Sequence, residues 1–147
     1  LGQGICESIL PIPMAPCGLG RALSCNCGWD NGDEGKNEVA LVTGGNRGVG
    51  YSAAKVLLQQ GHRVMLLCRD EKRASVSCKE LRRATGSSKA IVEQVDLANL
   101  ASVEAFCDRF RRSGQVVSIL VNNAGAISRN AMTINHVGHM ALCLGLS

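Results

Sequence analysis

The stretch Val39–Gly50, VALVTGGNRGVG, decides how this chain folds. It begins with four apolar residues, which are typical of a strand buried on both faces, and continues with the spacing T-G-x-x-x-G-x-G. Glycines at these positions let the chain turn tightly and let the backbone approach an anion at the start of the next helix. The stretch therefore predicts a strand, a diphosphate-binding turn and a helix, and the alternative interpretation is an ordinary helix start.

Short apolar runs and amphipathic segments of helix length alternate along the rest of the chain. Strands are predicted at 39–43, 63–68, 90–95 and 116–122, and helices at 48–60, 71–85, 99–112 and 133–144. This alternation indicates an α/β fold, a Rossmann-type doubly wound parallel sheet with strand order 3-2-1-4. We expect the sheet to be incomplete, with an open edge at its fourth strand.

The first 37 residues follow neither periodicity and are rich in Gly, Pro and Cys. We therefore divide the chain into an irregular extension or linker over 1–37 and a nucleotide-binding domain over 38–147. Eight cysteines lie at unrelated spacings, and the pair Cys25 and Cys27 lacks the second pair or nearby His that a zinc site needs. We expect no metal site and reduced thiols, which favours an intracellular, cytoplasmic protein, although organellar targeting stays open.

Composition narrows the range of partners. The chain carries 16 Lys and Arg against 12 Asp and Glu, with a net charge of +4. Its basic residues are interspersed with acidic ones and have few aromatic neighbours, which disfavours nucleic-acid binding. No apolar run approaches the ~18–20 residues of a membrane helix, so no membrane span is expected. A small anionic molecule is the favoured partner, and an oligomer is left open.

Three motifs, taken in chain order, resemble those of the short-chain dehydrogenases/reductases. They are the glycine loop at 43–50, the pair Asp96-Leu97 after the third strand, and Asn122–Gly125 (NNAG) after the fourth. CRD at 68–70, DLANLASVEAF at 96–106 and NHVGH at 135–139 are similar to the retinol dehydrogenase and protochlorophyllide reductase branch, and GGNRGVG is also similar to carbonyl reductases. The resemblance spans 38–144 and implies hydride transfer between a nicotinamide cofactor and a carbonyl or alcohol, but it does not identify the substrate.

The resemblance implies a cofactor site built from the loops that follow the strands. Its expected residues are Gly44, Asn46, Arg47, Gly48, Val49, Gly50, Arg69, Asp96, Leu97, Asn123, Ala124 and Gly125. In such a site Asp96 accepts a hydrogen bond from the adenine amino group, Leu97 lines the adenine pocket, and the small residues after the fourth strand let the backbone approach the ribose. The alternative role for Asp96 is to end a strand and cap the next helix.

The end of the second strand favours NADP over NAD. In dinucleotide folds an acid at this place bonds the ribose 2′-OH of NAD, whereas an Arg accommodates the 2′-phosphate of NADP. Here Cys68 stands where the acid is expected and Arg69 follows it, while Arg47 could reach the same phosphate. Asp70 argues for NAD, but by resemblance it lies one position too late, and we expect it to begin the next helix.

The only tyrosine heads YSAAK, which matches the Y-x-x-x-K pair that moves a proton in this family. Tyr51 and Lys55, however, follow directly after Gly50 and so fall on the first helix, whereas the family's pair lies beyond a fifth strand. We therefore expect an exposed pair on the helix surface rather than a catalytic one.

Asn135 matches the Asn that holds a proton-relay water in relatives, and it is the one candidate catalytic residue. Only nine residues separate it from Gly125, fewer than in the branch that the chain resembles. His136 and His139 follow on the same helix, and we expect them to pack or lie at the surface rather than to bind a metal.

These observations predict the cofactor-binding portion of an NADP(H)-dependent oxidoreductase for carbonyl or alcohol substrates, a fragment truncated before its catalytic Tyr and Lys and inactive by itself. The alternative is a non-catalytic dinucleotide-binding sensor or interaction protein.

Overall fold

A computed structural model describes residues 37–127 and 131–147. The predicted extension therefore lies outside the described residues except for Asn37, and so do Cys25 and Cys27. The described cysteines, Cys68, Cys78, Cys107 and Cys143, are free thiols. Within the described ranges, no helix combines the length and the apolar character needed to cross a membrane.

A parallel sheet of four strands forms the centre of the described residues. Its strands are β1 (Glu38–Thr43), β2 (Val64–Cys68), β3 (Ala90–Gln94) and β4 (Val116–Val121). They lie in the order β3-β2-β1-β4, and each neighbouring pair is parallel. The predicted fold class and strand order 3-2-1-4 are thus confirmed.

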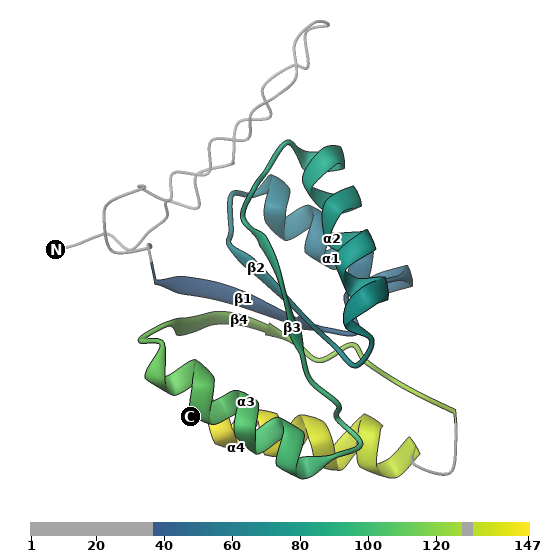
Figure 1. Ribbon diagram of the computed structural model, residues 1–147, viewed down its shortest axis with the longest axis vertical. Coiled ribbons are helices and arrows are strands. Elements are labelled where there is room, and N and C mark those ends of the chain that lie inside the picture. Colours follow the sequence, from purple (N-terminus) through teal and green to yellow (C-terminus); the bar gives the residue numbers. More distant parts are fainter. Residues whose placement is uncertain (1–36, 128–130) are drawn as a thin grey trace, which may run out of the picture. The chain divides into compact units, whose positions relative to one another are not determined.

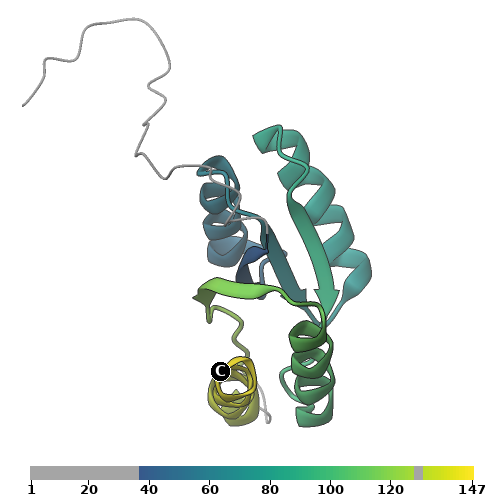
Figure 2. The same ribbon diagram turned by 90° about the vertical axis from the view of Figure 1, so that its left-hand side faces the viewer.

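Helices cover both faces of this sheet (Figures 1 and 2). They are α1 (Gly48–Gln59) and α2 (Glu71–Thr85) on one face, and α3 (Leu100–Arg112) and α4 (Gly138–Leu146) on the other. Two of them begin at side chains that cap the helix, because Asp70 accepts a hydrogen bond from the Arg73 N–H and Asn99 accepts one from the Ala101 N–H. The predicted helix boundaries for α1 to α3 hold to within one residue.

Alternate residues of β1 enter two different hydrophobic clusters. Val39 and Leu41 pack with Phe106 in the cluster on the side of α3 and α4. Ala40 and Val42 join the cluster on the side of α1 and α2. All four residues are completely buried. A strand that contributes to two cores must be apolar at every position, which explains the continuous run VALV in the sequence.

The fourth helical segment departs from the simple helix predicted over 133–144. Residues 131–132 are α-helical, a π-helical turn follows at Thr133–Val137, and the helix continues as α4 from Gly138. A π-helical turn accommodates an extra residue, and such turns are frequent at functional sites. This turn contains Asn135, whose side-chain amide accepts a hydrogen bond from the Ala126 N–H (2.8 Å) and donates one to the Ala126 carbonyl (3.1 Å).

Gly138 lets α4 lie directly against the loop that follows β3. A Cβ atom at this position would overlap the carbonyl oxygen of Leu97 and would lie 3.0 Å from the Leu97 Cβ. Because the obstructing atom is backbone, it cannot move aside as the tip of a side chain would.

We expect Gly138→Ala to destabilise the chain, although alanine is intrinsically the better helix former by about 1 kcal/mol. The overlap with Leu97 should lower the free energy of unfolding by about 1–3 kcal/mol, as measured by urea denaturation. Leu144→Ala, at a residue of the same helix that is 73% exposed, is the matched control and should change it by no more than about 0.5 kcal/mol. A Gly138→Ala chain as stable as the original would contradict the packing described here.

Candidate functional site

The glycine loop after β1 meets the turn after β4 with almost no space between them. Gly44 has a φ of +64°, and a Cβ added there would lie 3.0 Å from the Cα of Ala124. A Cβ at Gly50 would overlap the side-chain amide of Asn123, and that amide donates to the carbonyl of Thr43 at 3.0 Å. Glycine is therefore required at both positions for the two loops to touch.

The buried side chain of Thr43 connects these loops through its hydroxyl group. Its oxygen accepts hydrogen bonds from the backbone N–H groups of Asn123 and Ala124, both at 2.9 Å. These two bonds use both lone pairs of the oxygen. The hydroxyl proton is then available to the carbonyl of Val121 at 3.3 Å or to Nε2 of His139 at 3.0 Å.

His139 attaches α4 to this hydroxyl and is itself buried. Its Nδ1 lies 3.5 Å from the carbonyl oxygen of Asn135, one turn earlier. All these groups are satisfied when the ring carries its proton on Nδ1, so that Nε2 accepts the hydrogen bond from Thr43. Of the two histidines that were expected to pack or to lie at the surface, His139 is buried and His136 is exposed. Among the described residues no cluster of His, Cys, Asp and Glu is arranged to hold a metal ion.

The first turn of α1 leaves room for an anionic group. The first hydrogen bond of this helix runs from the Tyr51 N–H to the Arg47 carbonyl, so the preceding N–H groups at 48–50 have no partner within the helix. Gly48 has a φ of +57°, and a Cβ added there would meet nothing within 4 Å. Bare backbone, unpaired N–H groups and the positive end of the helix dipole fit the diphosphate of a dinucleotide.

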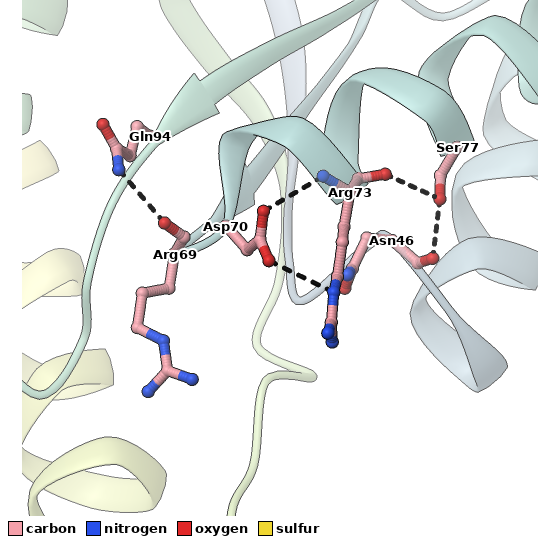
Figure 3. Close-up of polar contacts among 6 residues, drawn as sticks. All are labelled: Asn46, Arg69, Asp70, Arg73, Ser77 and Gln94. Atoms are coloured by element: carbon pink, nitrogen blue, oxygen red, sulfur yellow. Dashed lines mark hydrogen bonds and ion pairs between the residues drawn. The ribbon is translucent and has the colours of Figure 1, made fainter.

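Three consecutive residues at the end of β2, Cys68, Arg69 and Asp70, form the next part of the site, and Figure 3 shows the last two of them. Burial raises the pKa of the Cys68 thiol above its ordinary value, and the backbone N–H groups of Gly45 and Asn46 offset part of that effect. The thiol is therefore neutral and places no charge beside Arg69. Arg69 is exposed, and its carbonyl accepts a hydrogen bond from the side chain of Gln94 at 3.1 Å. Asp70 begins α2, as predicted.

Asp96 and Leu97 follow β3 after one intervening residue, Val95, and lie in the same row of loops. Asp96 Oδ1 accepts a hydrogen bond from the Ala98 N–H at 3.0 Å, which closes a local turn, and the helix cap that follows is Asn99 instead. Leu97 is buried in the cluster beneath α3 and α4. Their predicted contacts with adenine stay predictions.

Arg47 lies in the glycine loop and lines a hollow of about 540 Å³ with Gly125, Ala126, Ile127 and Asn135. The expectation that Arg47 reaches the same phosphate as Arg69 stays a prediction. The hollow is at the turn after β4, whereas Arg69 follows β2, on the other side of β1. The extended side chain of an exposed Arg has several rotamers, and sequence position alone does not show which one it adopts.

Tyr51 is half-buried, not exposed as predicted. It packs against the hydrophobic cluster shared by α1, α2 and the sheet, and Lys55 one turn later is also half-buried. The ring of Tyr51 therefore contributes to a core.

Sequence reasoning overlooked Arg73 and Ser77 on α2. Ser77 donates from its hydroxyl to the carbonyl of Asn46 at 2.8 Å and thereby fastens α2 to the glycine loop. Arg73 forms an ion pair with Asp70. The i,i+3 spacing of Asp70 and Arg73 at a helix start was the available signal for that pair.

Comparison with known proteins agrees with this geometry. Residues 38–140 match the family model for the short chain dehydrogenase family. Retinol dehydrogenase 11 from Mus musculus is 37% identical over 71% of this chain and 36% of its own length. Its counterpart from Homo sapiens is 36% identical over 97% of this chain and 41% of its own length. The chain thus spans well under half the length of these relatives.

Solved structures share the same arrangement of strands and helices. A metagenomic short-chain oxidoreductase in complex with NADP superposes with a TM-score of 0.67 at 26% identity, covering 75% of this chain and 55% of that one. A short-chain dehydrogenase from Sphingobium yanoikuyae in complex with NADPH gives a TM-score of 0.64 at 26% identity, covering 74% and 47%.

We expect Thr43→Val to destabilise the chain strongly, because valine has the shape of threonine but leaves the N–H groups of Asn123 and Ala124 without an acceptor. The loss in free energy of unfolding should be about 2–4 kcal/mol in a urea titration. Thr43→Ser keeps the hydroxyl and should lose only about 1 kcal/mol from the missing methyl group. Equal stability of the two variants would show that the hydroxyl does not hold the loops together.

Proposed function

This chain belongs to the short-chain dehydrogenase family, and we propose that it forms the cofactor-binding portion of an oxidoreductase that uses NADP(H) and acts on carbonyl or alcohol substrates. The observation that carries the proposal is the row of loops at one edge of the sheet. There a bare glycine turn begins α1, and Arg69 follows a neutral Cys68 at the end of β2.

The two ends of this row would hold different parts of the cofactor. The first turn of α1 suits the diphosphate, and Arg69 suits a phosphate on the adenosine ribose because a guanidinium binds phosphate with two parallel hydrogen bonds. The turn Asn123–Gly125 would approach the second ribose. A bound NADPH would supply the hydride for reduction of a carbonyl carbon.

Asn135 lies at the same end of the row as Asn123–Gly125. Its side chain is committed to the backbone of Ala126, so its carbonyl oxygen is the group left to face a water molecule or His139. We propose that Asn135 shapes this end of the site and serves proton relay through its backbone in a complete enzyme.

Cofactor preference tests the proposal directly. We expect the chain to bind NADPH more tightly than NADH. The Arg69→Asp substitution should reduce or reverse this difference in affinity. A charged hydrogen bond to phosphate contributes about 1.5–3 kcal/mol, which corresponds to roughly ten- to hundredfold in Kd, measurable by isothermal titration calorimetry. Arg83→Asp makes the same charge change about 20 Å further along α2 and should leave the preference unaltered. Equal affinities for both nucleotides in the original chain and in Arg69→Asp would refute NADP selectivity.

Turnover tests the role of Tyr51. Reduction of a carbonyl needs a proton at oxygen, and general acid catalysis contributes about 10²–10⁴-fold. Because Tyr51 is half-buried against the hydrophobic cluster of α1 and α2, we expect the 147-residue chain to show no aldehyde-dependent oxidation of NADPH above background. Tyr51→Phe should bind NADPH as the original chain does. Turnover that disappears in Tyr51→Phe would instead identify Tyr51 as the acid. If a chain extended to the length of its relatives binds NADPH but shows no turnover, that result would favour the sensor.

A further inference from the structure

Asp70 is an acid in a place where a dinucleotide fold often discriminates between cofactors. It lies one position later than the acid that the family resemblance implies, but still about 20 residues after the last glycine of the loop, at the turn after β2. A carboxylate in this region can accept a hydrogen bond from a ribose 2′-OH. A free carboxylate there would also repel a 2′-phosphate. The neighbouring Arg69 therefore does not by itself explain a preference for NADP(H).

Arg73 occupies both oxygens of this carboxylate. Asp70 Oδ1 accepts a hydrogen bond from the Arg73 N–H at 3.1 Å, and Oδ2 pairs with the Arg73 Nε at 3.2 Å. The first of these bonds caps α2, so it holds the carboxylate in a fixed orientation. The second offsets the charge of the carboxylate.

The position of Arg73 is set by the way α2 meets the glycine loop. Ser77, one turn further along the helix, is buried and donates to the carbonyl of Asn46 at 2.8 Å. Residues four apart share one helix face, so this contact turns Arg73 toward the loop. Figure 3 shows Arg69 and Arg73 extending to the same side of the view, with Asp70 between them.

We propose that Arg73 is a specificity-determining residue that acts by positioning and neutralising Asp70. The cap bond and the ion pair use one lone pair on each carboxylate oxygen and offset part of its charge. Asp70 therefore competes less well for a hydrogen bond from an unmodified ribose and opposes a 2′-phosphate at Arg69 less strongly. This inference rests on the proposed binding of NADP(H). It assigns the selectivity to three residues acting together. Arg69 binds the phosphate, and Arg73 neutralises Asp70, the acid that would otherwise select NAD.

The test is a double-mutant cycle on the affinities for NADPH and NADH. Arg73→Met keeps the backbone N–H that caps α2 and most of the side-chain stem, and Asp70→Asn keeps a capping oxygen. We expect Arg73→Met to lower the preference for NADPH about three- to fivefold, consistent with one exposed ion pair. In the Asp70→Asn background the same substitution should have almost no effect. Arg83→Met, later on α2, controls for general loss of positive charge.

Two results would overturn the proposal. If Arg73→Met weakens NADPH binding equally with Asp70 and with Asn at position 70, Arg73 contacts the phosphate itself and does not act through Asp70. If it leaves the preference unchanged in both backgrounds, Arg73 has no part in selectivity. Because the Arg73 side chain is 79% exposed, the variants should fold normally, and urea midpoints measured in parallel will verify this.

The outcome also separates this proposal from the function on which it depends. Tight NADPH binding that is lost in Arg69→Asp but insensitive to Arg73→Met would leave the proposed function standing and refute the role of Arg73. Absence of binding of either nucleotide to the original chain would refute both.

Discussion

The hydroxyl group of Thr43 fixes the position of the loops on which any cofactor binding would depend. It lies fully buried at the end of β1 and accepts hydrogen bonds from two N–H groups that are 80 and 81 residues away in the sequence. These bonds can form only when β4 is already paired beside β1. The close approach of Gly44 to Ala124 and of Gly50 to Asn123 requires the same alignment. The glycine loop is thus shaped by the complete sheet and not by its local sequence alone.

Much of the fold could be predicted because its determinants are local. Continuous apolar runs marked the buried strands, and Asp70 marked a helix start that the structure confirms. The next helix is capped by Asn99, and not by Asp96, which the sequence offered as an alternative cap. The π-helical turn at Thr133–Val137 could not be predicted in the same way. It accompanies hydrogen bonds between Asn135 and the backbone of Ala126, which depend on tertiary structure and leave no periodic signal.

In the candidate site, too, the sequence predicted the features with local determinants and missed those that depend on tertiary contacts. Motifs indicated which loops gather at one edge of the sheet, because the carboxyl ends of parallel strands all lie there. They did not indicate where long side chains point. Tyr51 is half-buried and packs against a hydrophobic cluster, although its place on the helix predicted an exposed residue. Neighbours from distant segments decide that direction, so the spacing of YSAAK carries no information about it.

Strand order explains why the row of loops has two chemically different ends. The chain leaves β1 outward through β2 and β3 and then returns to place β4 on the opposite side of β1, so the direction of winding reverses between β1 and β4. Ligands of open α/β sheets bind at such a reversal. On the β2 and β3 side lie cations and a neutral thiol, which suit a phosphorylated ribose, whereas the β4 side offers small residues, Asn135 and the buried His139. A dinucleotide lying across the reversal would therefore place its charged adenosine half over β2 and its reactive half over β4, beside the helix that Gly138 allows to pack closely.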